Sequence, residues 1–115
     1  MGNIKKSLTS EKLQVVYVVY PKGFKIEKLA KQLLDKKLVV CINVIPQVKS
    51  YYIWNSKHEK STEIIALFKT TKRQLLKLTS FLKSSHPYEV PLVCVLGIQR
   101  ANSEYLAYLS EQLAT

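Results

Sequence analysis

The sequence predicts an α+β sandwich in which amphipathic helices cover a four-stranded sheet. Two observations predict this class: four runs rich in β-branched and aromatic residues, and two intervening segments whose apolar residues recur at helical spacing. Their order is strand, helix, strand, strand, helix, strand, followed by a short terminal helix. A length of 115 residues suits one domain with one core. We expect residues 1–12 to be a flexible tail and residues 13–115 to form that domain.

The first strand is predicted from Leu13 to Tyr20, LQVVYVVY, and Pro21 ends it. Apolar residues then recur at i, i+3, i+4, i+7 and i+8 from Ile26 to Leu34. This spacing predicts an amphipathic helix from Phe24 to Lys37 on one face of the sheet.

An apolar ribbon of 17 residues, Leu38 to Trp54, follows the helix. Fully extended it would reach roughly 50 Å, whereas a compact domain of this size has a radius of gyration of about 13 Å. The ribbon should therefore overhang, with a bulge at Pro46. Its aromatic end would expose apolar area, and the simplest cover is a second copy of the chain.

The ribbon is expected to pair with a third strand, Glu63 to Thr70, across a polar loop, residues 55–62. Alternation places Val48, Ser50, Tyr52 and Trp54 on one side of the ribbon. Glu63 and Lys69 share a side of the third strand but lie about 20 Å apart, so each needs another partner.

Thr71 and Gln74 form a capping-box pattern before a second helix that ends at Ser84-Ser85. Two prolines in HPYEVP, residues 86–91, then force an extended entry into a fourth strand, Leu92 to Ile98. Asn102 is placed to cap a last helix, Tyr105 to Leu113.

This order defines a ferredoxin-like βαββαβ fold with a long second hairpin, and right-handed crossovers place the first and third strands in its centre. Cys41 and Cys94 then lie on opposite edge strands, roughly 14 Å apart. They could form a disulfide only across a subunit boundary.

The 18 Lys and Arg residues outnumber 8 Asp and Glu residues, for a net charge of +10. Most lysines are single, which is typical of solvated helix faces, and the third strand lacks the aromatic pattern of RNA-recognition domains. We therefore do not expect nucleic acid as a partner. No segment resembles a membrane span or a signal peptide, so we expect a cytoplasmic protein without a membrane partner.

Several motifs together closely resemble the CutA family of divalent-cation tolerance proteins over about Leu13 to Leu113. These motifs are CINVIP (41–46), SYYIW (50–54), EIIALFKT (63–70), HPYEVP (86–91) and YLAYL (105–109). The resemblance implies a tight homotrimer, similar in architecture to the PII signalling proteins, and a role in tolerance to copper and other divalent metals.

Position by position, the resemblance matches Cys41, the charged pair Glu63 and Lys69, and the HPY-x-x-P segment to family motif positions. In the family these positions surround a cleft between subunits. It also matches the aromatic positions of Trp54 and Tyr105. Two of three places at which copper ligands have been proposed in the family hold Val18 and Ser85 here, and only His86 is retained. A glycine usual after the tryptophan is replaced by Ser56.

Copper and zinc sites use thiolate and imidazole ligands, and three or four must converge. We predict His86 and Cys41 as metal ligands, with Glu63 as an oxygen donor at a subunit interface. His86 could equally orient the turn before Pro87 through hydrogen bonds. No organic cofactor is expected.

Aromatic residues concentrate in interface cores, so we predict an interface built by Tyr51, Tyr52, Trp54, Tyr88 and Tyr105. No nucleophile elbow or phosphate-binding loop is present, and we expect no enzyme activity. The alternative function is a PII-like regulatory or scaffold trimer that binds a small anion in a cleft between subunits, with Glu63 and Lys69 as its charged residues.

Overall fold

The computed structural model describes residues 13–113, so the tail expected for residues 1–12 lies outside the described part. One antiparallel sheet has the strand order β2-β3-β1-β4. This confirms the ferredoxin-like fold and its two central strands. The elements are β1 (Leu13–Pro21), α2 (Ile26–Asp35), β2 (Cys41–Trp54), β3 (Lys57–Thr71), α3 (Leu75–Ser85), β4 (Val93–Leu96) and α4 (Ser103–Leu113).

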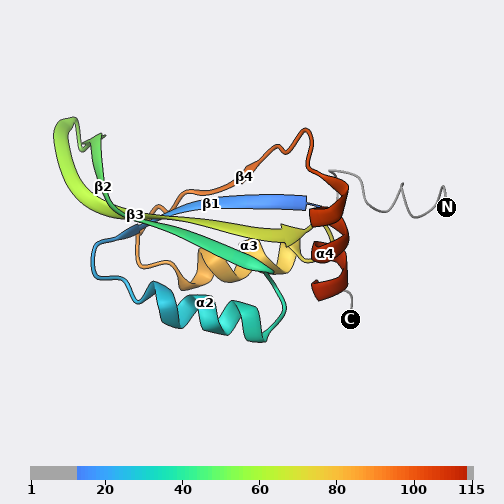
Figure 1. Ribbon diagram of the computed structural model, residues 1–115. Helices are drawn as coiled ribbons and strands as arrows, with labels where there is room; N and C mark the ends of the chain where they lie inside the picture. The colour runs from blue at the N-terminus through green and yellow to red at the C-terminus, as the bar shows by residue number, and fades with distance from the viewer. Residues whose placement is uncertain (1–12, 114–115) are drawn as a thin grey trace.

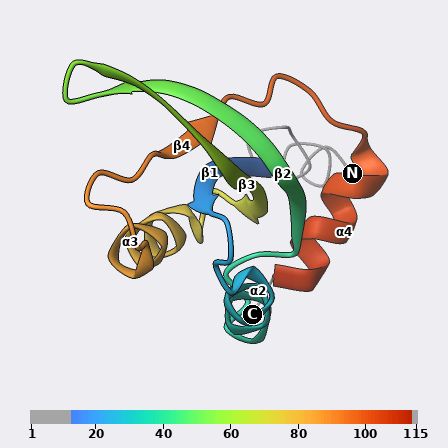
Figure 2. The same ribbon diagram turned by 90° about the vertical axis from the view of Figure 1, so that its left-hand side faces the viewer.

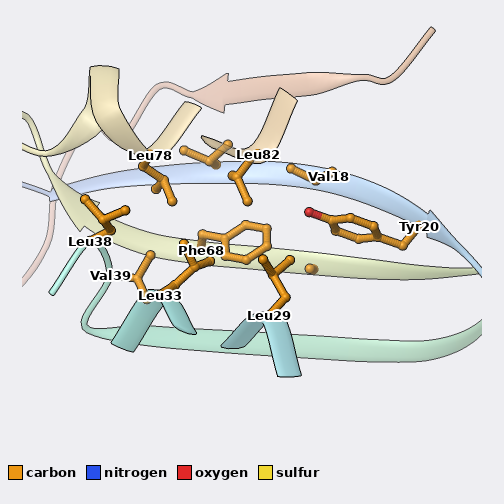
Figure 3. Close-up of a cluster of buried hydrophobic side chains, with 11 residues drawn as sticks. Val18, Tyr20, Leu29, Leu33, Leu38, Val39, Phe68, Leu78 and Leu82 are labelled. Atoms are coloured by element: carbon orange, nitrogen blue, oxygen red, sulfur yellow. The ribbon is translucent and has the colours of Figure 1, made fainter. Parts of the chain in front are cut away.

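Two helices cover one face of the sheet, and the third lies across one end of the other face (Figures 1 and 2). The face beneath α2 and α3 holds the main core, where Val16, Val18 and Phe68 are fully buried (Figure 3). On the opposite face, α4 buries Leu106 and Leu109 against Leu13 and Val15. Over the rest of that surface, away from α4, no helix of residues 13–113 lies above the sheet, and we call this part the open face.

The β2-β3 hairpin projects well beyond the body of the domain (Figure 1). The chain measures 56 × 27 × 22 Å and its radius of gyration is 15.9 Å, above the roughly 13 Å of a compact chain of this size. The overhang predicted from the length of the ribbon is therefore confirmed.

The loop predicted for residues 55–62 is wrong, because the two strands continue almost to the tip of the hairpin. Trp54 pairs with Lys57, which leaves only Asn55 and Ser56 to connect them. Their φ angles of 51° and 63° are those of a two-residue turn with left-handed central residues. Polar residues are tolerated in these strands because the hairpin is exposed on both faces.

A bulge at Pro46 and Gln47 determines which side chains of the outer part of β2 lie on each face of the sheet. Ile45 pairs with Ile65 and Val48 with Glu63, so β2 carries one more residue than β3 between these pairs. The extra residue reverses the alternation along β2. Residues 48, 50, 52 and 54 therefore share one face, as predicted, and the register places them on the open face with Glu63.

The ends of the helices differ from the predictions by a few residues, and the capping box is wrong. Thr71 is buried at the end of β3, and Gln74 precedes α3 without any side-chain capping bond. The first hydrogen bonds of this turn are made by backbone groups instead. None of the helices in residues 13–113 combines the length and apolarity needed to cross a membrane.

Candidate pocket at the base of the hairpin

A hollow of about 580 Å³ lies on the open face where the hairpin leaves the body of the domain. One wall comes from β2 and β3, and the other comes from the segment between α3 and β4, with Val19 of β1 between them. Its lining residues are Val19, Ser50, Tyr52, Trp54, Glu59, Ser61, Glu63, Tyr88, Glu89, Val90 and Leu92.

Cross-strand pairing explains why the hairpin wall has this composition. Val48, Ser50 and Tyr52 pair with Glu63, Ser61 and Glu59, and each pair directs its side chains to one face. The bulge determines which residues of β2 point to this face, so Tyr52 and Trp54 face the pocket while Tyr51 and Ile53 face away.

Glu63 is the buried carboxylate of the pocket, with only 9% of its surface exposed. It accepts a hydrogen bond from the hydroxyl of Tyr88, which closes the pocket between β3 and the opposite wall. The pKa of Tyr88 is raised by burial of the phenol, and further by its hydrogen bond to Glu63 and the charge of that carboxylate. The phenol thus remains a donor, and Glu63 keeps the partner that a buried charge requires.

His86 fixes the position of Tyr88. Its Nε2 lies 2.6 Å from the carbonyl oxygen of Val19, and the backbone amide of Tyr88 donates to its Nδ1 at 3.0 Å. A carbonyl only accepts, so Nε2 carries the proton and the ring is the neutral tautomer. The ring also stacks on buried Tyr20, with 4.6 Å between centroids. These contacts are the ones expected for one of the two roles considered for His86, that in which the ring orients the turn.

A second group of predicted residues lies at the other end of β3. Cys41 pairs with Lys69 across β2 and β3, and the Nζ of Lys69 lies 5.7 Å from the centre of the Tyr105 ring. The pKa of Tyr105 is raised by burial, and to a lesser degree by Cys41 and Tyr108. Tyr105 therefore belongs to the packing of α4 against the sheet, beside the open face, and lies apart from the pocket.

The predicted metal ligands do not converge within one chain. Cys41 lies opposite Lys69, six residues along β3 from Glu63, or about 20 Å away. His86 lies near Glu63 through Tyr88, but both of its ring nitrogens have partners in the chain. Residues 13–113 contain no group of three His, Cys, Asp or Glu side chains that could hold a metal ion.

The predicted interface aromatics are largely exposed in the single chain. The exposed fraction is 74% for Tyr51, 43% for Tyr52 and 51% for Trp54, and Ile53 between them reaches 70%. Tyr88 and Tyr105 are only half-buried. The hairpin thus presents an apolar surface on both of its faces.

Sequence reasoning missed Glu59 and Glu89, which bring two further carboxylates to the pocket. Glu59 fell within the supposed loop. Extending the alternation of β3 backward from Glu63 would have placed it beside Ser61 on the same face. Glu89 had no comparable signal, because the segment after Pro87 has no repeating pattern.

The fold and the pocket together define a class: a ferredoxin-like domain with an acidic, aromatic hollow beneath a projecting hairpin. A profile described as "CutA1 divalent ion tolerance protein" matches residues 14–112. The chain therefore belongs to the CutA1 family of divalent ion tolerance proteins.

Individual relatives agree with this assignment. A Xenopus laevis protein described as "Protein CutA homolog" is 37% identical over 105 residues, which cover 91% of this chain and 70% of the relative. The "Divalent-cation tolerance protein CutA" of Archaeoglobus fulgidus is 33% identical, over 84% of this chain and 93% of the relative. The crystal structure of CutA1 from Oryza sativa shares 34% identity with a TM-score of 0.80, over 88% of this chain and 93% of that one.

Proposed function

We propose that this chain acts in divalent metal tolerance as a cytoplasmic homotrimer that binds copper or a similar divalent metal at a site between subunits. One observation carries the proposal: the candidate ligands Cys41 and Glu63 lie on the same surface of the sheet, near opposite ends of β3. In a closed ring each subunit uses two different patches, so one end of a subunit can meet the other end of its neighbour.

A further observation supports the assembly. The hairpin exposes Tyr51 and Ile53 on one face and Trp54 on the other, and exposed apolar surface of this kind normally marks a contact surface.

The pocket lining favours a cation over the small anion of the alternative hypothesis. Glu59, Glu63 and Glu89 line it, and none of its described lining residues is a lysine or arginine. An anion held there would face three carboxylates in a partly desolvated space. We therefore retain metal binding as the proposed function and assign no second one.

Calorimetric titration of the assembled protein with Zn(II) and Cd(II) tests the proposal. We expect binding that weakens in acid, because protons compete with metal for the ligands. Cys41→Ser and Glu63→Gln should each weaken it by roughly tenfold or more, as loss of a ligand does. Cys94→Ser and Glu104→Gln are matched controls.

Binding that survives both ligand substitutions would overturn the site assignment. Binding of equal strength to dissociated single subunits would overturn its placement between subunits. His86→Ala separates two roles: loss of stability with retained metal affinity fits the hydrogen-bonded turn, whereas loss of affinity alone fits a ligand.

A further inference from the structure

The net charge of the protein is concentrated on one layer of the fold. We define the helix layer as residues 22–37 and 72–85, which contain α2 and α3 and their flanking turns. It carries ten lysine and arginine residues against Glu27 and Asp35, whereas the remaining described residues hold five basic and five acidic side chains. All ten basic residues are exposed: Lys22, Lys25, Lys28, Lys31, Lys36, Lys37, Lys72, Arg73, Lys77 and Lys83.

The charge is densest where the end of α2 meets the start of α3. The hydroxyl of Thr70 donates to the carbonyl of Leu38 at 2.6 Å, which fixes the two turns beside each other. Lys36, directly after α2, places its Nζ 5.7 Å from the centre of the Phe81 ring of α3. Figures 1 and 2 show both helices on the same face of the sheet. This end of the layer gathers Lys36, Lys37, Lys72, Arg73 and Lys77.

These charges do not stabilise the helix beside which they lie. Lys72, Arg73 and Lys77 flank the N-terminus of α3, whose first turn contains no acidic residue. The N-terminus is the positive end of the helix dipole, so cations there are unfavourable for folding. A role in binding an external anionic partner accounts for their placement.

Two leucines interrupt the basic surface at the same end. Leu76, in the first turn of α3, is 78% exposed, and Leu34, near the end of α2, is 46% exposed. Every phenylalanine of the layer is at least partly covered, so no exposed ring offers a platform for nucleic-acid bases. Nine of the ten cations are lysines, which act as point charges without the planar fork used to read bases.

We propose that the helix layer binds the surface of anionic phospholipid bilayers. Lysines spread in two dimensions match an extended anionic surface, and an exposed leucine among them can enter the boundary between headgroups and acyl chains. The layer lies opposite the open face, so contacts made through the hairpin and that face leave it accessible. This contact differs from the membrane span that the sequence lacks, and it revises the expectation of no membrane partner.

Co-sedimentation of the full chain with vesicles tests the proposal. We expect binding to phosphatidylcholine vesicles that contain about one third phosphatidylserine, and none to pure phosphatidylcholine. Binding should weaken strongly between about 50 mM and about 300 mM salt, because salt screens these charges.

A pair of quadruple variants distinguishes a specific role of the helix layer from a general effect of net charge. K37Q/K72Q/R73Q/K77Q and K49Q/K57Q/K60Q/R100Q each remove three lysines and one arginine, all exposed. We expect the first to lower vesicle affinity by on the order of a hundredfold or more, since each such charge contributes roughly fivefold. The second should bind like the unmodified chain. L76Q should lower affinity without changing the salt dependence.

Three results would overturn the proposal. They are equal binding to neutral vesicles, equal loss in the two quadruple variants, and absence of vesicle binding at low salt. Binding to a single-stranded or duplex oligonucleotide without vesicle binding would assign the layer to nucleic acid instead. The oligomeric mass of each variant, measured in parallel, shows whether a loss follows from altered assembly.

Discussion

At the scale of single residues, a stack of rings links the main core to the pocket. Phe24, Tyr20 and His86 stack in order with centroids 4.4 and 4.6 Å apart, and Tyr88 follows His86 at 4.9 Å. Tyr88 in turn reaches Glu63. The pocket carboxylate is therefore held in place by side chains that begin in the hydrophobic core, and changes within the stack should affect both stability and the pocket.

Tyr20→Phe should stabilise the protein. The hydroxyl of Tyr20 is buried and has no hydrogen-bond partner within residues 13–113. Removing an unpaired buried hydroxyl should raise the free energy of unfolding by about 1 kcal/mol. Urea unfolding at neutral pH measures this, with half-buried Tyr17→Phe on the same strand as the control. A lower free energy of unfolding would contradict the prediction.

Tyr20→Phe should also change how the free energy of unfolding declines at alkaline pH. Burial raises the pKa of Tyr20 above its ordinary value, so ionisation favours the unfolded chain once pH exceeds about 10. Stability is fully present below that pH and declines as pH rises through the folded-state pKa. We expect Tyr20→Phe to make this decline shallower in unfolding curves measured between about pH 9 and 11. An unchanged slope would show that other groups govern it.

His86→Ala should destabilise the fold by about 2–3 kcal/mol, because it leaves the carbonyl of Val19 and the amide of Tyr88 without their partners. Chemical denaturation of the assembled protein measures the loss. Exposed His58→Ala in the hairpin is the matched control and should change stability by less than about 0.5 kcal/mol. Equal losses in the two variants would refute the structural role of His86.

At the scale of elements, turn chemistry decides the shape of the hairpin. Asn55 and Ser56 both adopt positive φ, a conformation that asparagine tolerates better than serine does. Ser56→Gly should therefore raise the thermal midpoint, by the equivalent of about 0.5–1 kcal/mol. Ser50→Gly, within extended β2, should lower it. A lower midpoint for Ser56→Gly would show that the turn is not strained.

The sequence predicted that a long hairpin exists and which of its side chains share a face. It did not predict how far the two strands continue toward the tip. Alternation along β2 and the proline at residue 46 were enough to assign Tyr52 and Trp54 to one side. The turn was missed because Asn55-Ser56 lacks the glycine that usually marks it, and because exposed strands carry polar residues such as Lys57. The capping box failed for a different reason: burial of Thr71 at the end of β3 overrode its local preference.

The sequence predicted which residues to examine as a candidate site. It did not predict how those residues are arranged in space. Glu63, His86 and Cys41 were chosen by residue type and resemblance, but their separation depends on strand register, which places Cys41 opposite Lys69. The stack of rings that contains His86 joins β1 to the segment after α3, and these two segments are distant in sequence. Neither register nor long-range contact can be read from a local pattern.

At the scale of the whole molecule, the two faces of the sandwich have opposite characters. The helix layer is exposed and carries the net positive charge, while the hairpin and open face expose aromatic side chains around carboxylates. Such a division would let one face contact further copies of the chain while the helix layer stays accessible to other partners.

Trp54→Ala should damage assembly before it damages the fold of the subunit. Trp54 lies near the tip of the hairpin with half of its surface exposed, so its loss removes little from the core of its own chain. Truncating an aromatic anchor at an interface typically costs about 2 kcal/mol or more. We expect the mass measured by sedimentation to shift toward single subunits at low protein concentration, with an unchanged far-ultraviolet circular dichroism spectrum.

Leu76→Ala is the matched control, because Leu76 is also a large exposed apolar side chain but lies on the helix layer, where it is 78% exposed. It should leave the mass unchanged at every concentration. If Trp54→Ala instead keeps both the mass and the thermal midpoint of the unmodified chain, the hairpin does not hold the assembly. Loss of the spectrum together with the mass would mean that subunit folding and assembly are one process, as in obligate oligomers.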